Sequence, residues 1–242
     1  MIELPGPVAG LCAALGALRG VEAVALGGSR ATGTADAASD WDIGLYYRGQ
    51  PDFSALGRHG ELHPPGSWGR IMNGGAWLSL DGLKVDVLLR DLDAVEHWSA
   101  RARDGHYEVD ALLGYVAGVP TYSLMAELAL NRLVTGTLPR VGEFPPALAR
   151  SGAARWRQHA EFSLLHARMR AERGDVVGTV AQAAKAVVET AHAVVCGRGE
   201  WVLNEKNLVE RAGLREVHAQ FTHVPTSSPA LVDWVNALRG QI

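Results

Sequence analysis

Cysteine is almost absent from this chain of 242 residues, which has only Cys12 and Cys196. Both lie in apolar, helix-like runs, so we expect reduced core residues and neither a disulfide framework nor a cysteine-bound zinc site. No apolar run approaches the ~20 residues that a membrane-spanning helix needs. The first residues include Glu3 and no basic stretch, which argues against a signal peptide. We therefore expect a cytoplasmic protein that does not span a membrane.

A strong charge of one sign is also lacking. Lys and Arg number 23 and Asp and Glu 26, for a net charge of −3. Proteins that bind long nucleic acids or anionic membrane surfaces typically carry a basic surplus, so we expect neither partner. Hydrophobic residues make up 48% of the chain and charged residues 20%, which indicates a folded protein with a sizeable core. The length fits one large or two modest domains.

A glycine-rich turn follows a short apolar run at residues 21–26, which predicts a buried strand and then a tight bend. Gly28 allows the backbone to approach phosphate oxygens without an intervening Cβ, and the backbone N–H groups of such a turn can bind anions. Ser29 adds a hydroxyl and Arg30 a positive charge. A Gly-Ser turn alone is just as often an ordinary turn, so its meaning depends on the next residues of the chain.

Two carboxylates come next, at the head of a second predicted strand, residues 41–47, in the stretch Ser39-Asp40-Trp41-Asp42. Side chains alternate between the faces of a strand, so Asp40 and Asp42 share one face and Trp41 takes the other. Magnesium is usually held by one or two carboxylates together with substrate phosphates. The turn and the acid pair together therefore predict a triphosphate and a divalent metal side by side.

A third carboxylate lies in a predicted hairpin. Residues 76–80 and 83–89 read as two strands joined by Asp81-Gly82, a common hairpin turn. Val85 and Val87 would face one side of the sheet and Asp86 the other. An unpaired charge is costly in mid-strand, so Asp86 either lies at a sheet edge, is paired, or completes a metal site with the first two acids.

The second half of the chain has helical periodicity. We expect a helix from about residue 124 that ends before Gly136, then helices near 147–173, 176–196, 203–212, 214–221 and 229–238. Strands followed by helices predict an α+β fold: a mixed-sheet domain flanked by helices at 1–120, and an all-α bundle at 121–242. Glu127 is either a cleft residue or, as we prefer, a structural partner of Arg132 or another neighbour.

Two polar residues on the predicted helix 176–196 have two possible interpretations. Lys185 and Glu189 are four residues apart and beside an apolar stripe. They form either an ion pair on a solvated flank or part of a substrate site. In the second case Lys185 would contact the β- and γ-phosphates of a nucleotide, and Glu189 would lie near a substrate hydroxyl.

The motifs Gly28-Ser29, Asp40-x-Asp42 and Lys84-Val85-Asp86 resemble those of the nucleotidyltransferase superfamily typified by DNA polymerase β. More narrowly, they resemble the bacterial aminoglycoside and lincosamide nucleotidyltransferases. The resemblance covers about residues 21–95. A looser match of the helical half is to kanamycin nucleotidyltransferase and HEPN-type proteins. Trp41 departs from the more usual aliphatic residue between the two acids.

The resemblance implies transfer of AMP from ATP to a hydroxyl of a small molecule, such as an aminoglycoside or lincosamide-type antibiotic, and hence antibiotic resistance. It implies two Mg²⁺ ions held by Asp40, Asp42 and Asp86, with Asp86 our first choice for general base. The catalytic candidates are Asp86, Asp40, Asp42 and Glu189, and the nucleotide-binding candidates are Gly28, Ser29, Arg30, Ser39 and Lys185. The alternative is an antitoxin-like regulator that AMPylates or binds a protein partner. We expect a monomer or homodimer.

Overall fold

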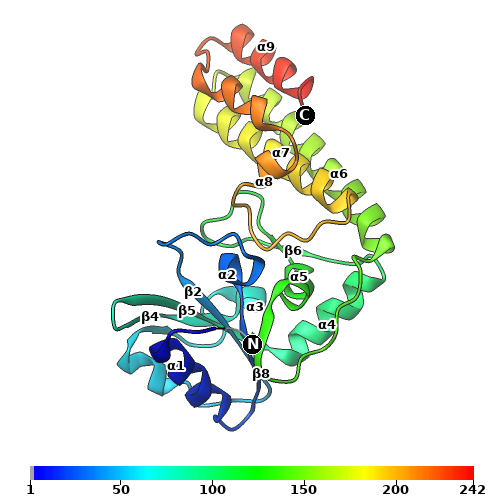
Figure 1. The fold of residues 1–242 in the computed structure, drawn as a ribbon. Helices are drawn as coiled ribbons and strands as arrows, with labels where there is room; N and C mark the ends of the chain where they lie inside the picture. The colour runs from blue at the N-terminus through cyan, green and yellow to red at the C-terminus, as the bar shows by residue number, and fades with distance from the viewer. Residues whose placement is uncertain (1–2) are drawn as a thin grey trace. The chain divides into compact units, whose positions relative to one another are not determined.

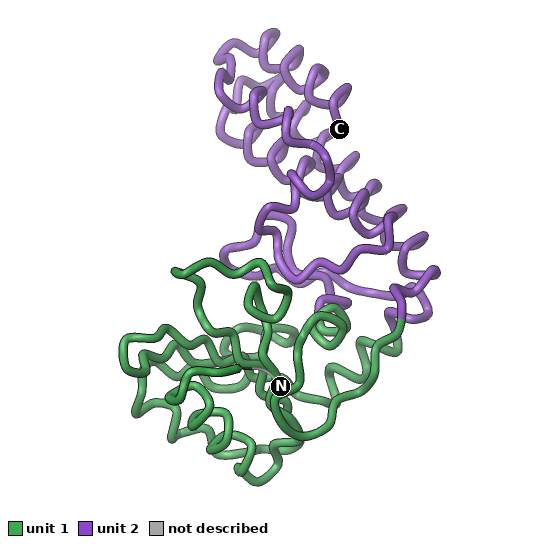
Figure 2. The backbone as a smooth tube through the Cα atoms, in the orientation of Figure 1, with its two compact units in different colours: residues 1–100, 124–142 green, residues 101–123, 143–242 purple. Residues whose placement is uncertain are grey.

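The computed structural model describes residues 3–242, and the chain divides into two compact units (Figure 2). The first contains residues 1–100 and 124–142, and the second contains residues 101–123 and 143–242. The units differ from the predicted division at residue 120, because each takes a segment from the far side of that boundary. Two domains at 1–120 and 121–242 therefore stay a prediction, while the α+β fold class is confirmed.

The first unit is built on a mixed sheet of strand order β3-β4-β5-β2-β1-β8 (Figure 1). The parallel pair is β2 with β5, and the other neighbouring strands are antiparallel. The strand bounds are β1 Val21–Leu26, β2 Trp41–Tyr47, β3 Gly60–His63, β4 Gly74–Leu80, β5 Leu83–Asp91 and β8 Arg132–Gly136.

The predicted strands at 21–26 and 41–47 are confirmed, as is the hairpin of β4 and β5. Asp81 and Gly82 both have positive φ, 50° and 82°, as a tight two-residue hairpin turn requires. The structure adds β3, which was not predicted. It pairs with β4, so that Glu61 lies opposite Trp77.

One face of the sheet carries the core of the first unit. Helix α1 (Gly6–Gly16) and the 3-10 helix η1 (Ser54–Arg58) pack there against the alternate residues of the strands. The buried set includes Val8, Cys12 and Leu15 of α1, Leu56 of η1, and Val24, Ile43, Leu45, Val85, Val87 and Leu89 of the strands. Because side chains alternate, Asp42 and Asp86 lie on the opposite face.

The remaining helices that contribute to this unit are α2 (Gly28–Thr32), α3 (Gly69–Met72), α4 (Leu92–Arg103) and α5 (Ser123–Leu130).

The predicted helix from about residue 124 to just before Gly136 is wrong in its second half. Helix α5 ends at Leu130, and Arg132–Gly136 form β8, which pairs antiparallel with β1. The leucines at 124, 128, 130 and 133 suggested one continuous helix. Val134 instead packs against the sheet core, and the pairing covers the edge of β1, which would otherwise expose unpaired backbone groups.

The second unit is dominated by α6 (Pro146–Ala171) and α7 (Val176–Gly197), and α9 (Ser228–Arg239) completes its core (Figure 1). These three confirm the predicted helices at 147–173, 176–196 and 229–238. The predicted helix at 203–212 is reduced to α8 (Leu208–Arg211), and 214–221 corresponds to a 3-10 helix, η2 (Arg215–Thr222). A small sheet, β6 (Val109–Asp110) with β7 (Val119–Pro120), belongs to this unit. Among residues 3–242, no helix is long and apolar enough to cross a membrane.

Candidate active site

The turn after β1 lies directly against the carboxylate of Asp42. Gly28 has φ of +60°, and a Cβ built on it would lie 1.8 Å from Asp42 Oδ2. The backbone N–H of Gly27 donates a hydrogen bond to the carbonyl oxygen of Asp42 at 2.8 Å. Only glycine fits at position 28, because any side chain would overlap that carboxylate. The structure thus brings together the predicted phosphate turn and one predicted metal ligand.

Arg30 fixes the path of the chain into β2. Its Nε donates to the carbonyl oxygen of Asp40 at 3.1 Å, and its Nη2 donates to that of Ser39 at 2.6 Å. The guanidinium also lies 4.1 Å from the ring centroid of Trp41. The structure therefore uses Arg30 to position the residues that precede Asp42, and a contact with phosphate stays a prediction.

Ser39 takes part in a local turn. Its hydroxyl donates to Asp36 Oδ1 at 2.9 Å and accepts from the backbone N–H of Asp36 at 3.0 Å. Ser29, in α2, is partly buried, and its carbonyl oxygen accepts from the backbone N–H of Thr34 at 2.9 Å. Roles for the Ser29 and Ser39 hydroxyls in nucleotide binding remain predictions.

The carboxylates of β2 and β5 lie on one face of the sheet, as predicted. Asp42 and Asp86 are register partners in the parallel pair, so their Cα atoms are neighbours across the sheet. The pKa of the Asp86 carboxyl is raised, first because burial disfavours its charged form and then because of the negative charge of Asp40. Lys84 opposes that shift. The effect of Asp40 on the pKa of Asp86 indicates electrostatic repulsion between the two carboxylates.

The acids provide the oxygen ligands that Mg²⁺ prefers, and a cation would relieve the repulsion between Asp40 and Asp86. Within residues 3–242, however, no three His, Cys, Asp or Glu side chains are grouped closely enough to hold a metal ion as they are oriented. The shared face and register thus supply suitable ligands, and the number of bound ions stays a prediction.

A comparison with known families agrees with this geometry, since residues 11–99 match the family model described as "Nucleotidyltransferase domain". This part of the chain is a nucleotidyltransferase domain. The match includes the Gly28 turn, Asp40, Asp42 and Asp86, so the recognition made from the motifs is confirmed at the level of the superfamily, and the chain is a nucleotidyltransferase. No curated protein matches the chain.

Two solved structures are similar at 10% sequence identity. A nucleotidyltransferase-like protein from Exiguobacterium sibiricum 255-15 is covered over 73% of its length by 97% of this chain, with a TM-score of 0.48. An aminoglycoside 6-adenyltransferase from Bacillus subtilis is covered over 88% by 96% of this chain, with a TM-score of 0.30. The nucleotidyltransferase assignment rests on residues 11–99.

A buried ion pair supports the acidic face of the nucleotidyltransferase domain. Arg90 is 1% exposed, and its Nε and Nη2 donate to the two carboxylate oxygens of Glu127, each at 2.6 Å. Its Nη1 donates to the carbonyl oxygen of Met72 at 2.8 Å. Glu127 is therefore structural, as preferred from the sequence, but its partner is Arg90 and not Arg132. A role for Arg90 was not predicted, although a basic residue directly after the predicted apolar strand 83–89 was a signal.

Asn131 is a second residue that supports this site, and its role was not predicted from the sequence. Its Nδ2 donates to the hydroxyl of Tyr46 at 2.7 Å. A Cβ built on Gly27 would lie 3.0 Å from Asn131 Oδ1, and one built on Gly44 would lie 2.9 Å from the ring of Tyr46. Asn131 thus packs closely against both the turn at Gly27 and Gly28 and strand β2. This role depends on the pairing of β8, which local sequence did not reveal.

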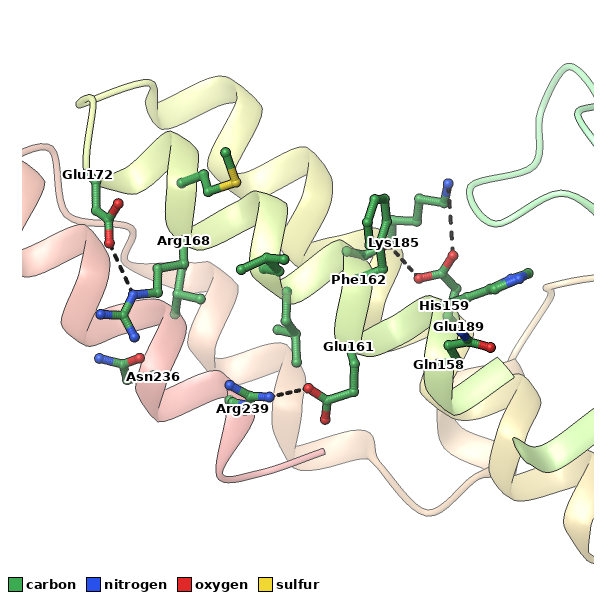
Figure 3. A pocket seen from close by; sticks show the side chains of 15 residues that line it. Gln158, His159, Glu161, Phe162, Arg168, Glu172, Lys185, Glu189, Asn236 and Arg239 are labelled. Carbon is green, nitrogen blue, oxygen red and sulfur yellow. Dashed lines mark hydrogen bonds and ion pairs between the residues drawn. The ribbon is translucent and has the colours of Figure 1, made fainter. Parts of the chain in front are cut away.

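Lys185 and Glu189 lie in the second unit, in a cavity of about 960 Å³ between α6, α7 and α9 (Figure 3). Glu189 accepts a hydrogen bond from Ser163 Oγ at 2.6 Å, and its other oxygen lies 3.8 Å from Lys185 Nζ. Burial raises the pKa of Glu189, whereas Ser163 and Lys185 act to lower it. Glu189 is 3% exposed, so the solvated-flank interpretation is wrong for it; the Lys185 side chain is 40% exposed. Catalytic and phosphate-binding roles for these two residues stay predictions.

Proposed function

We propose that this nucleotidyltransferase transfers AMP from ATP to a hydroxyl group of a small molecule in a reaction that requires Mg²⁺. The proposal depends most on one observation: Asp42 and Asp86 are register partners on parallel strands, and the Gly28 turn lies against Asp42. A triphosphate on the turn would therefore have its reacting phosphorus next to the acids.

In the proposed reaction the hydroxyl oxygen forms a bond to the α-phosphorus of ATP. The bond from that phosphorus to the bridging oxygen breaks, and pyrophosphate leaves with the electron pair. The proton of the hydroxyl passes to the carboxylate of Asp86. The raised pKa of Asp86 favours this role, because a base accepts a proton more readily when its pKa lies nearer the working pH.

Asp40, Asp42 and Asp86 are the proposed ligands of Mg²⁺, which when bound would neutralise the phosphate charges and hold the reacting oxygens in line. Gly28, Ser29, Arg30 and Ser39 belong to the proposed nucleotide site. Of these, Gly28 keeps the backbone close to Asp42, and Arg30 holds the carbonyl oxygens of Ser39 and Asp40. These contacts would preorganise the site before substrates bind.

Lys185 and Glu189 are kept as proposed contributors to the β/γ-phosphate and hydroxyl sites, respectively. Lys185 lines this cavity and its side chain is 40% exposed, so its ammonium could contact a ligand. Lys185→Ala should weaken MgATP binding by about tenfold, as loss of one charged hydrogen bond would. Calorimetric titration with MgATP measures this, and an unchanged affinity would restrict Lys185 to its pairing with Glu189.

A screen for acceptors tests the proposed function directly. The protein is incubated with ATP, Mg²⁺, and either antibiotics of the aminoglycoside and lincosamide classes or candidate proteins, and products are examined by mass for a gain of AMP. We expect a small hydroxyl compound to gain AMP and pyrophosphate to be released. Modification of proteins alone would instead favour the antitoxin-like AMPylator. A role in antibiotic resistance, a cytoplasmic location and a monomeric or homodimeric state remain predictions.

A further inference from the structure

A row of four side chains crosses the acidic face of the sheet. Glu61 on β3 is paired in register with Trp77 on β4, Trp77 with Asp86 on β5, and Asp86 with Asp42 on β2. Paired residues on neighbouring strands direct their side chains to the same face. Trp77 is therefore the immediate neighbour of Asp86, on the side away from Asp42.

Trp77 belongs to a cluster of three aromatic side chains. The ring centroid of His63 lies 4.5 Å from that of Trp77, and the centroid of Trp68 lies 5.6 Å from it. His63 and Trp68 are in turn 4.9 Å apart. Trp68 lies against Gly75, where a built Cβ would come within 2.6 Å of its ring. We refer to His63, Trp68 and Trp77 as the aromatic platform.

The exposure of Trp77 is not explained by packing. This side chain is 50% exposed, whereas its strand neighbours Ala76 and Leu78 are buried in the core on the other face. Ligand sites are commonly lined by aromatic side chains with a few polar groups beside them, and Trp77 has the partly buried Asp86 as its neighbour in register. Gly75 contributes to the platform, because the lack of a side chain there allows the ring of Trp68 to pack directly on the backbone of β4.

The order of the row indicates what binds to the platform. The Gly28 turn lies against Asp42, so the triphosphate of the proposed reaction is at that end of the row. In an in-line displacement the attacking oxygen approaches from the side opposite the leaving pyrophosphate. Asp86 lies between the two ends, so in the proposed reaction the attacking hydroxyl would approach from the side of Trp77.

We propose that the aromatic platform binds a ring of the acceptor, stacked on the indole of Trp77 so that a hydroxyl of that ring points to Asp86. The acceptor class is then a ring-bearing hydroxyl compound, such as a sugar or cyclitol, and not an acyclic alcohol. Glu61 is paired in register with Trp77, its side chain is 67% exposed and its Oε1 lies 3.5 Å from His63 Nε2, so it would add a negative charge beside the platform that suits an amine on that ring. This inference rests on the proposed AMP transfer, because it takes the phosphate end of the row from that reaction.

The test compares Trp77→Leu with Trp77→Phe in the full chain. Leucine keeps an apolar side chain on β4 but removes the aromatic face, and phenylalanine keeps a ring. The probes are kanamycin and lincomycin as ring-bearing hydroxyl compounds and sorbitol as an acyclic one, titrated by calorimetry in the presence of MgATP. MgATP itself is titrated separately, and thermal melting verifies that both variants are folded.

We expect the wild-type protein to bind at least one ring-bearing probe and not sorbitol. Trp77→Leu should weaken that binding by about tenfold or more, the usual effect of losing one aromatic stack, and Trp77→Phe should stay within about threefold. The affinity for MgATP should change by less than about twofold in both. Where AMP is transferred, KM for the acceptor should rise more than kcat falls.

Three results would overturn the inference: no binding of either ring-bearing probe, equal binding in Trp77→Leu, or a loss of MgATP affinity in that variant. The last would place the nucleobase on Trp77. The same experiment distinguishes failure of this inference from failure of the proposed AMP transfer. Ring-bearing probes that bind through Trp77 but never gain AMP would keep the platform and refute the transfer, whereas AMP transfer unaffected by Trp77→Leu would do the reverse.

Discussion

Two carboxylates, the partly buried Asp86 on the sheet and the buried Glu189 in the helical unit, have different electrostatic surroundings. Burial raises the pKa of both. For Asp86 the next cause is another carboxylate, Asp40, which raises the pKa further. For Glu189 the next causes are the Ser163 hydroxyl and the Lys185 ammonium, both of which lower it. One carboxylate is crowded by like charge, and the other is compensated by its neighbours.

This difference distinguishes an acid whose charge is compensated by its own neighbours from an acid whose nearest charged neighbours include a second carboxylate. When a hydrogen-bond donor and a cation lie beside a buried acid, they compensate within the fold for the hydration that its carboxylate loses. An acid beside another acid is stabilised only when a cation or a proton arrives, as metal binding or general-base catalysis supplies. Variants of Asp86, Glu189 and the turn beside Asp42 test this contrast. Substitutions of the acids on the sheet should lower turnover most.

Asp86→Asn should lower turnover by about 10²–10⁴-fold, the range for loss of a general base, with Asp42→Asn similarly impaired. The Asp86→Asn variant should stay folded and be at least as stable as the wild type at neutral pH, because the raised pKa means that ionisation of Asp86 opposes folding. Wild-type stability should accordingly fall as the pH rises from the ordinary value of 3.8 through the raised folded value, and the variant should lack this decline. Pyrophosphate release and melting against pH measure both effects. Undiminished turnover would refute the assignment of the site.

Gly28→Ala should lower turnover by about a hundredfold, because its Cβ would lie 1.8 Å from Asp42 Oδ2 and displace that carboxylate. Gly49→Ala is the matched control: Gly49 also has positive φ, +72°, but nothing lies within 4 Å of its built Cβ. Both variants should be destabilised by about 1 kcal/mol through backbone strain. Equal loss of turnover in both would mean that strain, and not the contact with Asp42, is responsible.

MgATP should stabilise the wild-type protein by about 2.7 kcal/mol at a hundred times its dissociation constant. Asp42→Asn should lose most of this gain, because it removes a proposed ligand of the metal. Thermal melting with and without MgATP measures the difference, and ATP with EDTA shows how much of the effect depends on the metal. If Asp42→Asn is protected as strongly as the wild type, MgATP does not bind through that carboxylate.

Glu189→Gln should have the smallest effect, on the order of 1 kcal/mol in stability, because glutamine still accepts the hydrogen bond from Ser163. The raised pKa of Glu189 predicts that wild-type stability falls as the pH rises from its ordinary value of 4.5 through the raised folded value. The variant should lack that component, so its stability relative to the wild type should increase across this interval. Chemical unfolding at several pH values checks this. A relative loss of stability with rising pH would show that ionised Glu189 is favoured by its neighbours more than burial disfavours it.

The local patterns predicted most of the sheet but not its edges. Strands 21–26 and 41–47 and the Asp81-Gly82 hairpin were readable because alternation, β-branched residues and turn chemistry act over a few neighbouring residues. Strand β8 was mistaken for a helix end, because its identity comes from pairing with β1, more than 100 residues earlier. Strand β3 was missed for the same kind of reason, since it is short and lies within a loop-rich stretch.

Local sequence was enough to predict which strand residues share a face. The alternation of side chains put Asp42 and Asp86 on the polar side of their strands, and the need for glycine marked the turn. The partners of these residues came from the tertiary fold. It aligned Asp86 between Asp42 and Trp77, joined Arg90 to Glu127, and enclosed Glu189 with Ser163 and Lys185. Periodicity indicates a direction along one element, but register and ion pairing depend on contacts between distant segments, which only the folded chain specifies.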